Sequence, residues 1–169
     1  AASLHASSGY RFDVPWAPRV VLQYDYASGD RSPDDGANHR FDPLFGARRF
    51  EFGPTGLWGA IARSNVSTPG LRLEAAPHPA VDAFAAFRLI WLASARDAWT
   101  TAALRDPTGD SGSFVGQQIE ARVRWHLFPR NLTFDVGGAG FVRGRFAESA
   151  PNGGTGPSAY VYSQVTGTI

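Results

Sequence analysis

The chain has 169 residues, a formal net charge of +1, no Cys and no Met. Without cysteine it forms no disulfide framework, no thiolate metal site and no cysteine nucleophile. A net charge near zero that is spread along the chain argues against nucleic-acid binding, and the absence of an apolar run of about 18 residues argues against a transmembrane helix.

The remaining composition favours strands. The chain is interrupted by 19 Gly and 12 Pro and contains 5 Trp, 5 Tyr and 12 Phe, which is typical of many short strands rather than long helices. All 16 basic residues are Arg. Arg offers carboxylates a planar and permanently charged fork of donors, although a GC-rich genome also favours Arg over Lys. Residues 1–8 have neither a charged nor an apolar region, so we expect no signal peptide there.

Apolar and polar side chains alternate with a period of two, which predicts seven strands. In chain order these cover residues 3–13, 18–28, 70–77, 82–94, 115–128, 132–145 and 158–169. The clearest example is the fifth, in which Ile119 and Val123 alternate with Glu120 and Arg122. The fourth is apolar on both faces except at Arg88, so its register is the least defined. Most segments are long enough to cross a bilayer at a tilt, which takes about 9 to 11 residues.

The connections between the predicted strands alternate in length. Short turns with Pro at 14–18, 77–81 and 128–131 alternate with long polar loops near 29–69, 95–114 and 146–157. Outer-membrane β-barrels have short periplasmic turns and long extracellular loops in this order. Residues 1–169 are therefore interpreted as one all-β domain, part of an antiparallel transmembrane β-barrel. In a soluble β-sandwich, the alternative, the apolar faces would meet a second sheet.

Seven is an odd number of strands, whereas bacterial single-chain barrels have even numbers. An open sheet would leave two unpaired edges in lipid, where each unmet backbone group is costly. We therefore expect further strands before residue 1, and Ile169 ends the last strand on the lipid-facing side. The alternative is an eight-stranded barrel in which the long loop at 29–69 supplies another strand, for example over residues 56–63.

The polar faces of the predicted strands carry eight Arg and five acids, an excess of three positive charges. The Arg are Arg11, Arg19, Arg72, Arg88, Arg122, Arg124, Arg143 and Arg145, and the acids are Asp13, Asp25, Glu74, Glu120 and Asp135. A ring of Arg in a low-dielectric wall attracts anions and binds carboxylates with two hydrogen bonds. Alternatively, Glu120 or Asp135 forms ion-pair ladders with Arg122 and Arg124 that brace neighbouring strands.

The loop near 29–69 holds two further groups of side chains. Four acids offer oxygen ligands for a hard cation, namely Asp30, Asp34, Asp35 and Asp42. They lack the EF-hand pattern, so we expect solvated acids and no metal site. Five aromatic residues are too apolar for a fully solvated loop, namely Phe41, Phe45, Phe50, Phe52 and Trp58. We expect them to fold inward as a plug or to pack over the rim of the barrel.

The sequence contains no recognisable catalytic motif. The four His, at positions 5, 39, 78 and 126, have no metal-ligand spacing, and no phosphate loop, nucleophile elbow or zincin motif occurs. A Ser-His-Asp site, which outer-membrane lipases build on barrels, is the one catalytic alternative. We predict no catalytic residues and no cofactor.

Strings such as YDYASGD at 24–30 and FDPLFGARRF at 41–50 resemble the C-terminal half of the alginate export family of outer-membrane proteins. Further matching strings lie at 52–56, 63–65, 67–73, 91–94, 97–99, 105–106, 116–125 and 129–132. The resemblance covers nearly the whole chain. It implies an 18-stranded barrel in the bacterial outer membrane, of which these are the last seven strands, with an Arg-rich lumen that passes an anionic uronic-acid polysaccharide outward.

Two functions follow from these observations. The first is an outer-membrane channel that passes an anionic polysaccharide such as alginate; the second is a general anion-selective uptake porin for small anions. In both, the eight Arg named above line the pore together with Glu120 and Asp135. The expected partners are the lipid bilayer, the polysaccharide or small anions, and periplasmic export proteins.

Overall fold

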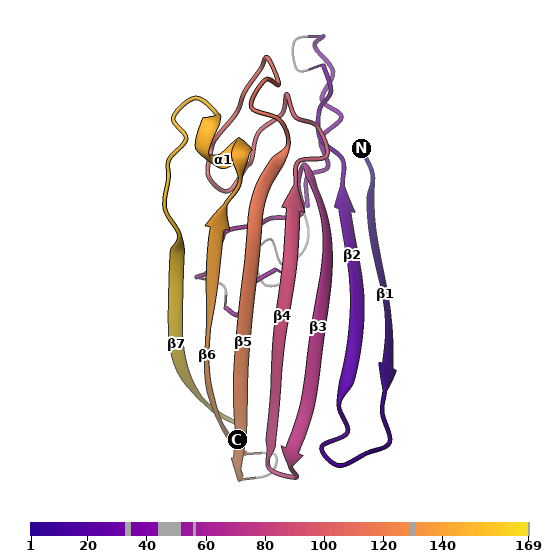
Figure 1. Ribbon diagram of the computed structural model, residues 1–169, viewed down its shortest axis with the longest axis vertical. Coiled ribbons are helices and arrows are strands. Elements are labelled where there is room, and N and C mark those ends of the chain that lie inside the picture. The colour runs from indigo at the N-terminus through magenta and orange to yellow at the C-terminus, as the bar shows by residue number, and fades with distance from the viewer. Residues whose placement is uncertain (33–34, 44–51, 56, 129–130, 169) are drawn as a thin grey trace.

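Seven antiparallel strands form one curved sheet in the computed structural model, which describes residues 1–32, 35–43, 52–55, 57–128 and 131–168. Each strand pairs with the next along the chain (Figure 1). They are β1 (Ser3–Arg11), β2 (Arg19–Ala27), β3 (Val66–His78), β4 (Val81–Trp91), β5 (Phe114–Phe128), β6 (Leu132–Arg143) and β7 (Ser158–Gly167). The predicted all-β, antiparallel fold is confirmed. In the part of the chain that is described, no helix is long and apolar enough to cross a membrane.

The two faces of the sheet have opposite character, as the alternation predicts. On β5, Ile119 and Trp125 are exposed on the convex outer face, with 60% and 52% of their surface accessible. Their neighbours Gln118 and Glu120 point to the concave face, here called the inner face, and are 1% and 8% accessible. Polar side chains inside and apolar side chains outside reverse the usual arrangement of a water-soluble domain. Lipid outside and a polar lumen inside would produce this arrangement.

Short and long connections lie at opposite ends of the sheet (Figure 1). At one end, residues 12–18 join β1 to β2, and residues 79–80 join β3 to β4. At the other end, long loops run through residues 28–65, 92–113 and 144–157, the last of which includes α1 (Arg145–Ser149). The alternation of connection lengths expected from the sequence is therefore present in the structure.

Several strand boundaries differ from those expected, among them those of β3, β4 and β6. β3 begins at Val66 instead of 70, because Pro69 lies within the strand as the register partner of Tyr24. β4 ends at Trp91 instead of 94, and β6 ends at Arg143 instead of 145. Gly144 forms the N-cap of α1, so Arg145 lies in a helix beyond the sheet.

The described residues do not form the eight-stranded alternative. Residues 57–63 contain no strand, and the described sheet runs from β1 to β7 without pairing between these two edges. Ile169, which was expected on the outer face, lies outside the described residues.

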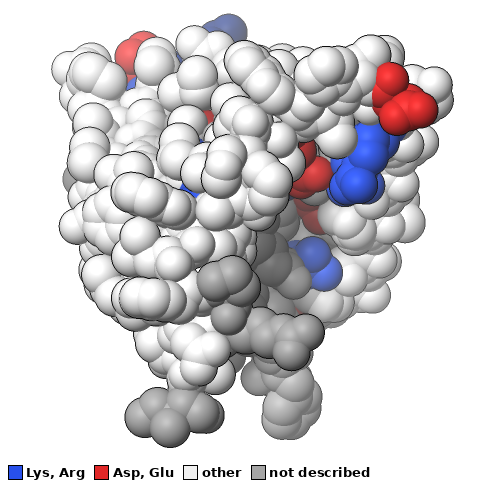
Figure 2. Space-filling view, turned by 90° about the horizontal axis from the view of Figure 1, so that it is seen from below, with Lys and Arg blue, Asp and Glu red and all other residues white. Residues whose placement is uncertain are grey.

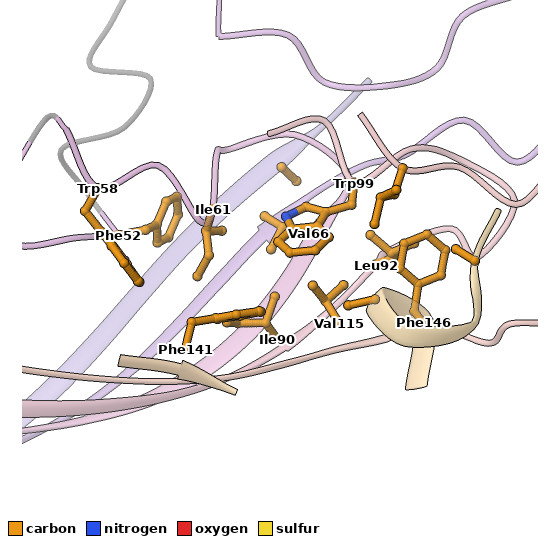
Figure 3. Close-up of a cluster of buried hydrophobic side chains, with 14 of the residues drawn as sticks. Phe52, Trp58, Ile61, Val66, Ile90, Leu92, Trp99, Val115, Phe141 and Phe146 are labelled. Atoms are coloured by element: carbon orange, nitrogen blue, oxygen red, sulfur yellow. The ribbon is translucent and has the colours of Figure 1, made fainter. Parts of the chain in front are cut away.

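The buried apolar core lies between the loops and the inner face at the long-loop end of the sheet (Figure 3). The sheet supplies Val66, Ile90 and Phe141 to this cluster. The loop between β2 and β3 supplies Phe52 and Trp58, which are 2% and 9% accessible. Full burial of one such side chain contributes roughly 1.5 to 3 kcal/mol. The core therefore holds this loop inside the curve of the sheet.

Inward folding of the aromatic loop is thus confirmed for Phe52 and Trp58, and Phe41 packs against the same cluster from a partly buried position. Phe45 and Phe50 lie outside the described residues. The segment comprising residues 52–55 and 57–62 is called the inner loop below.

Candidate pore-lining site

One row of inner-face residues crosses all seven strands, each residue being the register partner of the next. The row consists of Arg11, Arg19, Glu74, Phe84, Arg122, Gly137 and Tyr162. It is called the Arg row below. Figure 2, a view from the short-turn end, shows charged atoms inside the hollow of the sheet and at its rim. Strand pairing therefore brings together charges that lie far apart in the sequence.

Two guanidinium groups share one carboxylate in the middle of this row. The Arg19 side chain donates to Glu74 across the strands over 3.1 Å, and Arg72 donates to the other oxygen of Glu74 over 2.7 Å. The Arg72 guanidinium also lies 3.6 Å from the centre of the Phe84 ring, and that of Arg122 lies 5.0 Å from it. Such cation–π contacts each add roughly 0.5 to 2 kcal/mol. Arg19 and Arg72 are therefore held against the wall.

Asp82 is a site residue that the sequence interpretation missed. Its carboxylate accepts a hydrogen bond from Arg122 over 2.8 Å and forms a second one with Nε2 of His126 over 2.9 Å. The predicted strand around Asp82 is apolar on both faces except at Arg88. Asp82 lies an even number of residues from Arg88 and so on the same face, and this spacing could have identified it. With Asp82 included, and with Arg145 and Asp13 outside the strands, seven Arg accompany five acids on the inner face, so the positive excess is two instead of three.

The predicted ladder between Arg124 and Asp135 is present. Arg124 donates through Nε and Nη2 to the two oxygens of Asp135, over 2.6 and 2.9 Å, and the two residues are cross-strand partners on β5 and β6. This bidentate geometry is the strong form of an Arg–carboxylate pair. Glu120, by contrast, forms no such pair: its Oε2 atom is buried without a hydrogen-bond partner among the described residues.

A second cluster lies on β2 and β4, nearer the long loops. Arg88 donates to Asp25 over 3.1 Å and to Gln23 over 3.0 Å, and both Arg88 and Asp25 are buried. His5 contributes a 2.6 Å hydrogen bond to the same carboxylate, and Arg63 lies 3.6 Å from it. Because Asp25 has several partners, Arg88 is compensated within the wall and does not present a free charge.

The pairing leaves few of the predicted Arg unengaged. Of the eight, Arg19, Arg72, Arg88, Arg122 and Arg124 are in ion pairs. Arg145 donates to the backbone oxygen of Asp110. Within the described ranges, Arg11 and Arg143 have no ion pair and no side-chain hydrogen bond. Arg11 ends β1 at the short-turn end and Arg143 ends β6 at the long-loop end. The two free guanidinium groups thus lie at opposite ends of the inner face.

The inner loop is attached to the sheet through Gln118. The Oε1 atom of Gln118 accepts a hydrogen bond from Trp58 Nε1 over 2.8 Å, and its Nε2 atom donates to the backbone oxygen of Phe52 over 2.7 Å. Thr55 and Tyr160 add a hydroxyl–hydroxyl hydrogen bond of 2.9 Å. The Arg88 guanidinium lies 5.4 Å from the centre of the Phe52 ring. These polar contacts fix the position of the loop on the inner face.

An ion pair connects two of the long loops. The buried carboxylate of Asp97 accepts hydrogen bonds from Arg40 and from the backbone N–H of Asp30. Burial opposes ionisation of Asp97, but these hydrogen bonds and one from the N–H of Ala98 outweigh it and hold the pKa of Asp97 below its ordinary value. Asp30 is itself buried, so the expectation of a solvated acid is wrong at this position.

The other loop acids give no sign of a metal site. Asp35 accepts a local hydrogen bond from the N–H of Ala37, and Asp34 lies outside the described residues. Asp106 accepts from Thr108 and Ser111, which lowers the pKa of Asp106 and closes a tight turn. The described part of the chain brings no three His, Asp or Glu side chains together in an arrangement that could hold a metal ion.

The family comparison agrees with this architecture. A family model described as alginate export matches residues 2–156, which include β1 to β6 and α1. No curated protein matches the chain. The matched family consists of transport channels of the outer membrane rather than enzymes. The chain therefore belongs to the alginate export family of outer-membrane β-barrel proteins.

Proposed function

We propose that this chain forms part of the wall of an outer-membrane channel through which an anionic polysaccharide such as alginate passes. The apolar outer face suits lipid, and the inner face carries the Arg row and the ion-paired clusters. The unpaired edges of β1 and β7 would be costly in lipid, so we infer that they pair with other strands of an 18-stranded barrel. The long loops then lie outside the cell, and the short turns face periplasmic export partners.

The observation that carries this proposal is the division of the inner-face Arg into two groups. The paired ones, such as Arg124, are neutralised by cross-strand carboxylates and brace the wall. Arg11 and Arg143, at the two ends of the conduit, have no carboxylate partner in the described part of the chain. A free guanidinium forms two hydrogen bonds with one carboxylate, so each is suited to hold a uronate carboxylate as the polymer enters or leaves.

A general anion-selective uptake porin for small anions is the second candidate, and the same two residues favour it. A free guanidinium at each mouth raises the local concentration of any anion, whatever its size. The two functions predict different effects of an added polymer on conductance. An export channel binds the polymer along its conduit and is blocked by it, whereas a small-anion porin excludes the polymer and conducts unchanged.

Conductance of the complete native chain in planar bilayers, with and without an added oligouronate, tests the proposal. We expect current blockades in the wild type, with shorter dwell times in the double variant Arg11→Gln and Arg143→Gln. The variant Arg96→Gln, which removes one exposed charge from the loop between β4 and β5, serves as the matched control. If the wild type conducts without blockades, the small-anion porin is favoured. Equal dwell times in all variants would contradict the role of Arg11 and Arg143.

A further inference from the structure

One aromatic side chain of the Arg row packs against a glycine of the neighbouring strand. Tyr162 lies on the inner face of β7, and its register partner on β6 is Gly137. A Cβ atom at Gly137 would lie 2.8 Å from Cε1 of Tyr162 and 2.9 Å from its hydroxyl oxygen. The Tyr162 ring therefore covers the bare backbone of Gly137. Only glycine leaves room for a ring so close to the sheet.

Within the described chain, the hydroxyl of Tyr162 and the face of its ring turned away from Gly137 remain available. The hydroxyl of Tyr162 makes no hydrogen bond to any described residue, whereas the hydroxyl of Tyr160 is bonded to Thr55. No guanidinium of the described chain lies over the Tyr162 ring, in contrast to Phe84, which has Arg72 and Arg122 on it. Tyr162 thus differs from Tyr160 and Phe84 in offering both an aromatic surface and a free hydroxyl.

A second tyrosine extends this surface along the strand. The rings of Tyr160 and Tyr162 are nearly parallel, with centroids 5.9 Å apart and an interplanar angle of 19°. Trp58 of the inner loop follows, with its ring centre 5.9 Å from that of Tyr160. The three aromatic rings form a line that runs from the level of the Arg row to the inner loop.

Charged groups on β5 lie beside this line. Arg122 is the register partner of Gly137, so it is two strands from Tyr162 in the same row. Arg124 lies one residue pair further toward the short turns, next to Asp135. A sugar ring bearing a carboxylate has an apolar face of C–H groups, polar hydroxyls and one negative charge. An aromatic face, a free phenol and a nearby guanidinium match these three features.

We propose that Tyr162, continued by Tyr160, is a stacking platform for the pyranose rings of the polysaccharide that passes through the channel. The inference rests on the proposed function and deepens it. The platform holds the sugar by its ring face, and the Arg side chains act on its carboxylate. A channel for small inorganic anions would have no use for such a surface.

The test measures the dwell time of oligouronate blockades in single channels of the complete native chain. Replacing Tyr162→Leu removes the flat ring and the hydroxyl without changing any charge, so dwell times should fall roughly three- to tenfold. Tyr162→Phe keeps the ring and should retain most of the dwell time. The control Tyr24→Leu makes the same change on the outer face, where Tyr24 is exposed, and should leave blockades unchanged.

A second measurement uses only the wild type, so it does not depend on the folding of a variant. Polyacrylate of matched length and charge has carboxylates but no pyranose rings. The platform predicts longer blockades by the oligouronate than by polyacrylate, and equal dwell times would overturn it. Blockades in the wild type that are unchanged in Tyr162→Leu would also overturn the platform but not the channel. The absence of oligouronate blockades in the wild type would overturn the proposed function and the platform together.

Discussion

Replacement of Gln118 by Leu should release the inner loop from the sheet. The side chain of Gln118 is 1% accessible and makes two hydrogen bonds to the loop, one with Trp58 and one with the backbone of Phe52. Leu has a similar size but leaves the Trp58 N–H and the Phe52 carbonyl without partners. Each orphaned buried group costs about 1 to 3 kcal/mol. The docked state should lose at least about 2 kcal/mol, so the undocked population should rise roughly thirtyfold.

Limited proteolysis and hydrogen exchange of the inner loop measure this change directly. We expect faster cleavage and faster exchange in Gln118→Leu, together with a larger and noisier single-channel current because the loop occupies the lumen. The matched control is Gln164→Leu on β7, where the exposed side chain hydrogen-bonds to Thr166 and, among the described residues, to no part of the inner loop. The reasoning would be refuted if the loop in Gln118→Leu exchanged and was cleaved as slowly as in the wild type.

Two further perturbations have defined outcomes. Gly137→Val would place a Cβ atom 2.6 Å from the Ala121 carbonyl oxygen and close to the Tyr162 ring. This crowding should destabilise the protein by about 1 to 3 kcal/mol. On gels, the band of the folded barrel should therefore disappear at a lower heating temperature than in the wild type. Unchanged heat stability would show that the strands can separate there at no cost. Because the pKa of Asp97 is below its ordinary value of 3.8, its ion pair with Arg40 stabilises the loops above that pH and is lost as the pH falls through the lower folded pKa. After correction for intrinsic rates, hydrogen exchange in these loops should therefore be constant from pH 7 to about pH 5. The loops of Asp97→Asn should exchange faster over the whole range. If the loops of this variant were as protected as those of the wild type, the ion pair between Asp97 and Arg40 would not hold them together.

The strands could be predicted because lipid outside and a polar lumen inside impose a strict alternation on each one. The exceptions have local causes. The predicted loop near 29–69 ends at Pro69 and Gly70, which are residues common in turns. In the structure Pro69 is the register partner of Tyr24 of β2, and the pairs of β3 with β4 on either side of it are Ser67 with Trp91 and Gly70 with Arg88. Pro has no N–H to donate, so it fits a strand position where the ladder does not use one.

The pore-lining site was harder to predict because ion pairing depends on register. Parity correctly placed Arg72 and Arg124 on the inner face, but it does not show that Arg72 shares Glu74 with Arg19 or that Arg124 meets Asp135. A shift of two residues between strands would preserve the parity and change every partner. That Arg11 and Arg143 lack ion pairs among the described residues also depends on the register of the strands, and no local pattern reveals it.

The docking of the inner loop was only partly predictable. Its aromatic residues indicated that the loop would be buried. Gln118, which forms the hydrogen bonds to the loop, looked like an ordinary polar position on a strand. The platform at Tyr162 was hidden for the same reason, since it depends on the pairing of that residue with Gly137 across two strands. Contacts between segments 60 or more residues apart require the fold.

The reversal potential of single channels under a salt gradient tests the central claim that the inner face forms an anion-attracting conduit. The complete native chain in a planar bilayer should prefer chloride over potassium, and the preference should weaken as ionic strength rises, because salt screens the free charges of Arg11 and Arg143. A channel that prefers potassium at low salt would contradict the account.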